Sequence, residues 1–465
     1  MPIIPGEDTI VALSTPPGTG AIAVIRLSGK NAIVIAEKIF RGKKLSQAAS
    51  HTLHHGYISD PEKTGTSGES EIDEVVLGIF KAPNSYTKED VVEISSHGSA
   101  FIAQKIIQLL IRNGARAAKA GEFTLRAFLN GRMDLSQAEA VADLISSDSE
   151  SSHQAAMNQM RGGFSSEIKK LREELIHFAS LIELELDFAE EDVQFANRHQ
   201  LKELLSRLTS HVSRLKSSFQ LGNVIKHGVT AVIAGRPNAG KSTLLNALLN
   251  EERAIVSEFP GTTRDAIEEV ININGILFRL IDTAGIREAT DVIEKIGVEK
   301  TMEKIRQSAI VIYVFDVKEL SRDDLMYDLS RLPLKEIPAI AVGNKIDGEA
   351  SRNFESEYAP IENLLFISAK EKTHIDLLKE KLASLVLHDE KLGDKTIVTN
   401  TRHYDALVKT EEALDDVLRS LESGTSQELF VADIRRALNA LGEITGEITT
   451  DDLLATIFSR FCIGK

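Results

Sequence analysis

The chain has 465 residues, which at about 100 to 200 residues per domain favours several domains over one. Hydrophobic residues make up 42% and charged residues 26%, with 11 prolines and 30 glycines, and this balance excludes a disordered or fibrous protein. The net charge of −15 argues against non-specific binding to nucleic acids, and the single cysteine excludes an internal disulfide bond.

No stretch approaches the roughly 20 apolar residues that span a bilayer, since the longest run, residues 309–315, has the length of a strand. The first residues lack the basic and apolar segments of a secretion signal. We therefore expect a cytoplasmic protein that is not embedded in a membrane.

Residues 1–130 contain strand-like apolar runs at 21–27 and 74–80 and a helical segment at 101–110, which predicts an α+β domain. Apolar residues three and four apart then predict long helices in residues 131–222 and again in 388–465. Neither helical segment makes an obvious core alone, so we expect the two to pack against each other.

The segment between them, residues 223–387, alternates strands with helices, which is typical of an α/β domain with a mainly parallel sheet. The predicted strands are residues 229–235, 277–285, 309–316, 338–345 and 364–370. An α/β module can be inserted into a helical domain because the ends of such a module usually lie close together.

Residues 235–242 read GRPNAGKS, a phosphate-binding loop (P-loop) between a strand and a helix. Backbone N–H groups of such a loop surround the phosphates, Lys241 reaches the β and γ phosphates, and the hydroxyl of Ser242 can ligate magnesium. The next strand ends in Asp282-Thr283-Ala284-Gly285, where Asp282 can bind magnesium through water and the Gly285 N–H faces the γ phosphate.

Residues 344–347 read NKID, and Asp347 can accept hydrogen bonds from N1–H and the exocyclic amine of guanine, which adenine cannot offer. Ser368-Ala369-Lys370 would close over the base. Four such motifs in order at strand ends predict a GTPase domain. The predicted GTP-binding residues are Asn238, Ala239, Gly240, Lys241, Ser242, Thr243, Thr262, Thr263, Asp282, Thr283, Ala284, Gly285, Asn344, Lys345, Asp347, Ser368, Ala369 and Lys370.

The residue after the second motif is Ile286, whereas Ras-like enzymes have a glutamine there that orients the attacking water. Another group must position the water. The candidates are Arg287, Glu288 and Glu294, and spacing alone does not choose among them.

The motifs GRPNAGKS, GTTRD, DTAGIRE and NKID, with GEFTLRAFLNGRMDLSQAEAVADLI from Gly121 and the terminal FCIGK, resemble those of the bacterial tRNA-modification GTPases of the MnmE (TrmE) family. The resemblance covers essentially the whole chain. It implies an N-terminal domain similar to tetrahydrofolate-binding domains, a discontinuous helical domain and an inserted Ras-like G domain. The corresponding boundaries are 1–130, 131–222 with 388–465, and 223–387.

The resemblance further implies a homodimer that works with an FAD-dependent MnmG-type partner. Together they would add an aminomethyl or carboxymethylaminomethyl group to carbon 5 of the wobble uridine of certain tRNAs, with GTP hydrolysis driving or gating the chemistry. The one-carbon unit would come from 5-formyltetrahydrofolate or a related folate, bound by Arg26, Glu93, Arg132 and Lys465. From the residues alone, Arg26 and Glu93 would read as ordinary surface charges.

In the family a potassium ion takes the place of an arginine finger. Its ligands would be Asn238, Ser257, Phe259 through its carbonyl, and Thr262, with Ser257 also part of the GTP site. Magnesium would be held by Ser242 and Thr263. The family's catalytic glutamate falls on Glu294, with Arg287 nearby and Glu288 as the second choice.

Cys462 could be a nucleophile toward a pyrimidine, but a lone cysteine is more often a small buried hydrophobe, and no neighbouring histidine activates it. His51, His54 and His55 suggest turn or surface residues more than a metal site. Two other functions stay open from the residues: a ribosome-assembly GTPase acting as a switch, and a folate-dependent one-carbon transferase with a regulatory G domain.

Overall fold

The computed structural model describes residues 8–63, 70–187, 198–252, 268–282, 302–334, 337–347, 353–387, 396–423 and 427–465. The chain forms two compact units. The first consists of Met1–Ala142, Gln159–Lys202 and Glu412–Lys465, and the second of Asp143–Asn158 and Glu203–Glu411. None of the described helices is both long enough and apolar enough to cross a bilayer.

The first unit contains a seven-stranded sheet in the order β3-β4-β5-β6-β2-β1-β7. All neighbouring strands are antiparallel except β1 and β7. The strands are β1 (Thr9–Leu13), β2 (Ile22–Ser28), β3 (Phe40–Arg41), β4 (Thr52–Ser59), β5 (Glu71–Phe80), β6 (Val91–His97) and β7 (Ala115–Ala117). The register pairs Arg26 of β2 with Glu93 of β6, so these two predicted ligands lie side by side.

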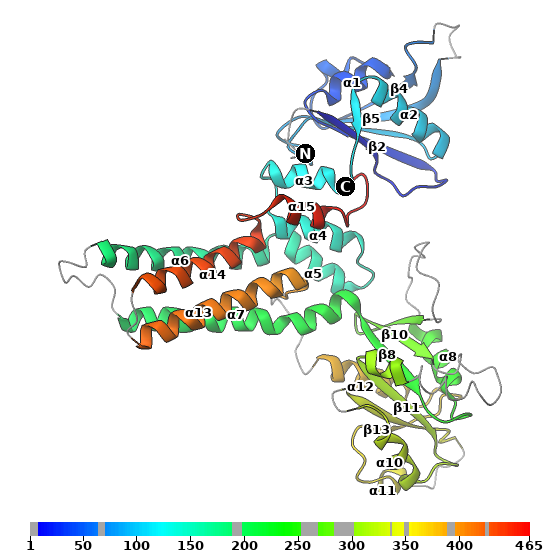
Figure 1. Ribbon diagram of the computed structural model, residues 1–465. Coiled ribbons are helices and arrows are strands. Elements are labelled where there is room, and N and C mark those ends of the chain that lie inside the picture. Colours follow the sequence, from blue (N-terminus) through cyan, green and yellow to red (C-terminus); the bar gives the residue numbers. More distant parts are fainter. Residues whose placement is uncertain are drawn as a thin grey trace. The chain divides into compact units, whose positions relative to one another are not determined.

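Helices α1 (Ala32–Ile39) and α2 (Ala100–Arg112) cover one face of this sheet (Figure 1). Their apolar sides pack on alternate strand residues such as Ile25 and Leu27. Because side chains alternate along a strand, Arg26 and its neighbour Glu93 point to the opposite face. A short 3-10 helix, Leu45–Gln47, follows β3.

Two further groups of helices complete the first unit. Helices α3 (Glu122–Leu129) and α15 (Asp451–Phe458) lie next to each other (Figure 1), and a small core joins them to α4 (Leu135–Ile145). The long helices α6 (Gly163–Asp187) and α14 (Gln427–Thr445) pack together.

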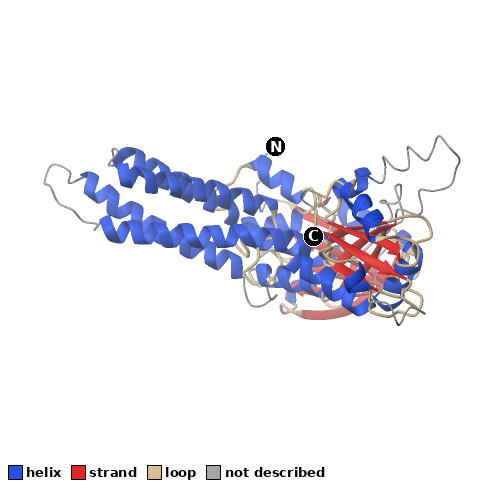
Figure 2. Cartoon of the chain, turned by 90° about the horizontal axis from the view of Figure 1, so that it is seen from below, coloured by secondary structure: helices blue, strands red, loops and turns tan. Residues whose placement is uncertain are grey.

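The second unit contains α7 (Arg198–His227) from Glu203 onward, α13 (Thr401–Ser423) up to Glu411 and α5 (Glu150–Met160) up to Asn158. Lys216 of α7 forms an ion pair with Glu411, and the rings of Phe219 and Tyr404 stack with centroids 4.5 Å apart. The long helices of both units are drawn in blue in Figure 2. The pairs α6–α14 and α7–α13 each join residues 131–222 to residues 388–465, as the apolar periodicity predicts.

The second unit also holds a six-stranded sheet in the order β13-β12-β11-β8-β10-β9, parallel except for β9. Its strands are β8 (Val229–Ala234), β9 (Glu268–Ile273), β10 (Ile276–Asp282), β11 (Ile310–Asp316), β12 (Ala339–Asn344) and β13 (Leu364–Phe366). Its helices are α8 (Lys241–Glu252), α10 (Arg322–Ser330), α11 (Phe354–Glu357) and α12 (Ile375–Leu387). Apolar cores lie on both faces of the sheet, so the predicted α/β fold with a mainly parallel sheet is confirmed.

Candidate functional site

The P-loop at residues 235–242 connects β8 to α8 in the second unit. Gly235 has a φ of +145°, and a Cβ added there would lie 2.0 Å from the carbonyl oxygen of Val314. Gly240 has a φ of +93°, and its Cβ would lie 2.2 Å from Nδ2 of Asn344. Both positions therefore require glycine, and the loop leads into the N-terminus of α8, where backbone N–H groups favour phosphate.

Lys241 occupies the inside of this loop. Its ammonium donates hydrogen bonds to the carbonyl oxygens of Gly235 at 3.1 Å and Arg236 at 2.8 Å. Ser242 and Thr243 follow on the exposed first turn of α8. An ammonium held by two carbonyl groups can transfer to phosphate oxygens without a change of the loop backbone, and Ser242 stands where a magnesium ligand is expected.

The carboxyl ends of the parallel strands bring the other predicted motifs to the same edge of the sheet. Asp282 ends β10 and pairs in register with Ile233 of β8. Asn344 ends β12 beside Asp316 of β11. Lys345 has a φ of +70°, and its ammonium lies 2.6 Å from Oδ2 of Asp316.

Asn344 joins the P-loop to the last motif. Its side chain is buried, and its Nδ2 donates to the carbonyl oxygen of Ala239 at 2.9 Å. Its Oδ1 accepts a hydrogen bond of 3.0 Å from the backbone N–H of Ala369. One side chain thus ties the P-loop to the loop that is expected to close over the base.

Asp347 stands at the solvent side of this arrangement. The hydroxyl of Ser368 donates to its Oδ1 at 2.8 Å, and this hydrogen bond lowers the pKa of Asp347 below its usual value. The carboxylate is therefore ionised at neutral pH and can accept two further hydrogen bonds. Ser368 and Ala369 are buried, whereas the side chain of Lys370 is exposed and pairs with Glu371 at 3.5 Å.

Asn238 is exposed in the P-loop with a φ of +60°. The remaining predicted residues of the hydrolytic site lie outside the described residues. They are Ser257, Phe259, Thr262, Thr263, Thr283, Ala284, Gly285, Arg287, Glu288 and Glu294. The choice between Glu294 and Glu288 is therefore still a prediction.

A second site lies in the first unit, on the sheet face opposite α1 and α2. A cavity of about 500 Å³ opens there, and its walls come mainly from the loop between β5 and β6. It is lined by His51, Phe80, Pro83, Asn84, Ser85, Tyr86, Lys88, Val91, Glu93 and Arg132. Two of the four predicted folate ligands, Glu93 and Arg132, are therefore wall residues.

The other two predicted ligands lie beside the same cavity. Arg26 donates from Nε to Oε1 of Glu93 at 2.8 Å and from Nη1 to the carbonyl oxygen of Gly464 at 3.3 Å. The side chains of Arg26 and Glu93 are only 13% and 30% exposed, so they are not ordinary surface charges. Burial, and after it the charge of Arg26, lowers the pKa of Lys465.

Tyr86 is the centre of this group. Arg26 and Arg132 each lie with their guanidinium carbon 5.3 Å from its ring centroid, and the ammonium of Lys465 lies 6.0 Å away. Its hydroxyl hydrogen-bonds the hydroxyl of Thr124 at 2.8 Å, and burial raises its pKa. Three cations thus surround one aromatic ring, which favours a flat ligand that carries negative charge.

The C-terminal tail is part of this site. The carbonyl oxygen of Gly464 also accepts from the Ser14 hydroxyl at 3.2 Å, and Ile463 forms a bridge with Ala120. Cys462 is exposed, so the interpretation of this residue as a small buried hydrophobe is wrong. Its main chain, whose carbonyl oxygen accepts from the Gly121 N–H at 3.4 Å, fixes the tail.

The family models and the relatives agree on one family. A model described as "GTP-binding protein TrmE N-terminus" matches residues 9–132, and one described as "MnmE helical domain" matches residues 135–462. "tRNA modification GTPase MnmE" of Cytophaga hutchinsonii is 56% identical over 98% of both chains, and that of Flavobacterium psychrophilum is 56% identical over 99% of both.

The chain belongs to the MnmE (TrmE) family. Among solved structures, an Aquifex aeolicus Era variant bound to GDP and AlF4− is 29% identical over 40% of this chain and 66% of that chain. Its TM-score of 0.27 is too low for an argument about function. Family membership rests on the full-length sequence relatives.

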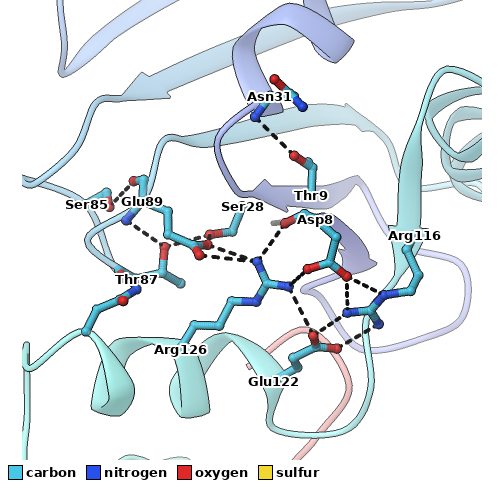
Figure 3. A network of polar contacts seen from close by, with 11 residues as sticks. Asp8, Thr9, Ser28, Asn31, Ser85, Thr87, Glu89, Arg116, Glu122 and Arg126 are labelled. Carbon is cyan, nitrogen blue, oxygen red and sulfur yellow. Dashed lines mark hydrogen bonds and ion pairs between the residues drawn. The ribbon is translucent and has the colours of Figure 1, made fainter. Parts of the chain in front are cut away.

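The sequence of this MnmE-family chain does not single out Tyr86, because the residue lies in an irregular loop without a periodic pattern. Residues 85–89 are fixed by the polar network of Figure 3, in which Glu89 accepts hydrogen bonds from Ser28 at 2.6 Å and from Arg126 at 3.3 Å. Arg126 is fully buried and also binds Asp8 at 2.6 Å. The only sequence signal was an aromatic residue within a polar loop.

Within the described residues, no group of three or more His, Cys, Asp or Glu side chains is arranged to hold a metal ion. His55 pairs with Glu74 at 2.6 Å, and the ring of His54 hydrogen-bonds Thr52 at 2.7 Å. His51 has a φ of +62° in a turn and lines the cavity.

Proposed function

We propose that this chain is a GTPase that acts in tRNA modification, as the printed names of its full-length relatives say of those proteins. It would hydrolyse GTP to GDP and phosphate in the domain of residues 223–387. The observation that carries the proposal is the pair of sites above. In one site, Asn344 joins the P-loop to the motif at residues 368–370 that is expected to close over the base. The other site is a cavity around Tyr86 that is lined by cationic side chains.

The geometry of Asp347 supports GTP over ATP. Its ionised carboxylate is held by Ser368 and still has lone pairs to accept from N1–H and the exocyclic amine of guanine. Adenine has an acceptor at N1 and lacks that amine, so it would leave the carboxylate unpaired. A carboxylate covered by a bound base and left without these hydrogen bonds costs about 1–3 kcal/mol, which sets the size of the expected selectivity.

The hydrolytic step would use ions as well as side chains. Ser242, at the start of α8, and Thr263 fit a magnesium ion, because hydroxyl oxygens are ligands that magnesium prefers. Asn238, exposed on the P-loop, fits a potassium ion together with Ser257, Phe259 and Thr262. A bound cation supplies positive charge where negative charge develops between the β and γ phosphates.

Glu294 would position the attacking water, with Arg287 close to the reacting phosphate and Glu288 as the alternative. No glutamine follows the DTAG motif, so another group must position the water, and the resemblance to the family favours Glu294. We propose a homodimer in which the G domains pair across the nucleotide, as the resemblance to the family implies, so that hydrolysis depends on the dimer.

The cavity of the first unit would bind 5-formyltetrahydrofolate or a related folate. Glu93 can accept hydrogen bonds from pterin N–H groups, and Tyr86 offers a ring on which a flat heterocycle can stack. Arg26, Arg132 and Lys465 outnumber the single carboxylate, so the site favours the negatively charged glutamate end of a folate. The folate supplies the one-carbon unit.

We further propose that the chain acts with an FAD-dependent MnmG-type protein on carbon 5 of the wobble uridine in certain tRNAs, in the cytoplasm. In this scheme the GTPase cycle would gate the chemistry. A role for Cys462 stays open: its exposed thiol lies two residues before Gly464, whose carbonyl binds Arg26.

The first test is the rate of GTP hydrolysis in potassium against sodium at matched ionic strength, over a series of protein concentrations. A large potassium-specific acceleration whose specific activity rises with concentration supports both the cation and the dimer. Equal rates in the two salts would remove the potassium mechanism. Wobble uridines that are unchanged in tRNA from a deletion strain would remove the function in tRNA modification.

A further inference from the structure

Arg236, the second residue of the P-loop, has its side chain bound by a helix outside the loop. Its Nε donates to Oδ2 of Asp328 at 2.7 Å, and its Nη2 donates to Oδ1 of the same carboxylate at 3.0 Å. Asp328 lies in the last turn of α10 and its side chain is 17% exposed. This is a two-pronged arginine–carboxylate pair, the geometry that restricts an arginine most strongly.

A buried tyrosine fixes the carboxylate from the other side. Tyr313 of β11 is 5% exposed, packs in the core between the sheet and α10, and donates its hydroxyl to Oδ2 of Asp328 at 2.5 Å. Although burial raises it, hydrogen bonds from Arg236 and Tyr313 bring the pKa of Asp328 below its usual value. The carboxylate is therefore charged at neutral pH.

The position of Asp328 on its helix is unfavourable for α10 by itself. Carbonyl groups gather negative charge at the C-terminus of a helix, so a carboxylate in the last turn destabilises the helix. Asp323, in the first turn, is the favourable case on the same helix. Asp328 is thus explained by what it binds, and not by the stability of α10.

The backbone at the start of the P-loop, Gly235 and Arg236, makes two further close contacts. Gly235 lies so close to β11 that a Cβ would meet the carbonyl of Val314, and the carbonyl of Arg236 accepts from Lys241. Lys241 must leave that carbonyl group to bind phosphate, whereas the side-chain bond between Arg236 and Asp328 does not compete with a nucleotide. The first turn of the P-loop is therefore held from outside while its inside is free to change partners.

We propose that Arg236, Asp328 and Tyr313 form a clamp that holds the first turn of the P-loop open for phosphate before the nucleotide arrives. In this role Arg236 is a positioning residue and does not touch phosphate in its own G domain. The clamp would slow nucleotide release and raise affinity for GTP and GDP alike, because both place phosphates in the same loop. It would leave the chemical step unchanged.

The opposite assignment makes Arg236 a catalytic arginine that swings from Asp328 to a phosphate of its own or a partner G domain. The two assignments predict different effects of an Asp328 substitution on the rate of hydrolysis. If Asp328 only holds a catalytic arginine away from the phosphate, a substitution that weakens their contact releases Arg236 and raises the rate of hydrolysis. If Asp328 positions the arginine, the same change speeds nucleotide release and leaves the single-turnover rate of hydrolysis of bound GTP unchanged.

The experiment uses the full-length chain with fluorescent GDP and GTP analogues, measuring dissociation rates by stopped flow and the hydrolysis of bound GTP in a single turnover. Asp328→Asn keeps the size of the side chain and an acceptor for Tyr313, but removes half of the arginine contact. We expect it to speed release of both nucleotides about tenfold, equivalent to about 1.4 kcal/mol of a charge-assisted pair. Arg236→Lys should behave similarly, because an ammonium cannot make the two-pronged contact.

Asp323→Asn is the matched control, the same substitution on the same helix. It should lower the unfolding temperature slightly by weakening the start of α10 and leave nucleotide release unchanged. The double variant Arg236→Ala with Asp328→Asn should release nucleotide no faster than Arg236→Ala alone, since both changes break one contact.

Three results would overturn the clamp: wild-type release rates in Asp328→Asn, additive effects in the double variant, or faster single-turnover hydrolysis in Asp328→Asn. The inference rests on the proposed GTPase function. Failure of the wild-type chain to bind either nucleotide would refute that function, whereas normal wild-type binding with an unaffected Asp328→Asn variant refutes only the clamp.

Discussion

Replacing Gly464 by alanine tests the role of the C-terminal tail in the cavity of the first unit. Gly464 has a φ of +97°, and an added Cβ would lie 2.3 Å from the carbonyl oxygen of Leu13 and 2.9 Å from Cα of Ser14. The obstacle is backbone and cannot rotate away. Leu13 ends β1, which is hydrogen-bonded to strands on both sides, so we expect the tail to shift and the strands to stay, and Gly464 to lose its bonds to Ser14 and Arg26.

The size of the effect follows from the strain. A backbone held in a sparsely populated φ region costs about 1–3 kcal/mol, and this would disfavour the tail conformation that places Lys465 near Tyr86. If only that conformation binds folate fully, the apparent dissociation constant for 5-formyltetrahydrofolate rises about 5- to 150-fold. The loss cannot exceed that caused by deleting residues 464–465, which removes the same contacts.

Isothermal titration calorimetry with 5-formyltetrahydrofolate measures this affinity, and GTP hydrolysis of the same samples shows whether the other unit is intact. Gly18→Ala is the control, because Gly18 has a φ of +127° with no atom within 4 Å of an added Cβ. It introduces a similar backbone penalty without displacing the tail. Wild-type folate affinity in Gly464→Ala would show that the tail does not form part of the folate site.

Three further outcomes follow from the two sites. Asp347→Asn should shift base preference from guanine toward xanthine by about 1–3 kcal/mol, and an unchanged ratio of GTP to xanthosine triphosphate affinity would contradict the role of this carboxylate. Glu294→Ala should slow hydrolysis at saturating GTP about 100-fold or more with nearly unchanged GTP affinity, whereas a wild-type rate would shift the role to Glu288. The pKa of Lys465 lies below the ordinary 10.5, and a folate carboxylate binds its charged form. Folate affinity should therefore be full at neutral pH and should fall, as the pH rises, at a lower pH than for an ordinary lysine. In that pH range folate binding should take up protons. Calorimetry in buffers of different ionisation enthalpy measures this uptake, and its absence would exclude Lys465 as a ligand.

The GTP site was predictable from sequence because its parts are local. A glycine-rich turn between a strand and a helix works through its own backbone, and parallel strands bring their carboxyl ends to one edge. The side-chain hydrogen bonds between its loops were not predictable. Asn344 reaches Ala239 and Ala369, and Arg236 reaches Asp328, only because distant segments approach in the folded domain.

The strand β9 was missed although the sequence carried its signal. Asn274 and Gly275, with φ values of +52° and +84°, form the tight turn that joins β9 to β10. An Asn-Gly pair between two alternating apolar segments is a strong hairpin signal. The apolar run of β10 was recognised, but the more polar β9 before the turn was not.

In the first unit, the resemblance predicts four folate ligands, and the fold brings these four residues close together around Tyr86. Register alone pairs Arg26 with Glu93, but the loop that carries Tyr86 is set by side chains of β2 and α3. Glu89 of that loop binds Ser28 of β2 and Arg126 of α3 (Figure 3). No short-range pattern encodes such contacts, because Ser28 and Arg126 lie 61 and 37 residues from Glu89 along the chain.

The electrostatics of the two sites resolve an apparent conflict in the composition. The chain carries a net charge of −15, yet both proposed ligands are anions. At physiological ionic strength, charges more than about 8 Å apart are largely screened, so local groups decide binding. Around Tyr86 these groups are three cations and one carboxylate, and at the P-loop they are Lys241 and the backbone N–H groups of α8. The negative charge of the rest of the chain then opposes non-specific contact with polyanions. An anion that fits the site around Tyr86 or the P-loop, or a polyanion guided by a partner, still gains enough local attraction to bind.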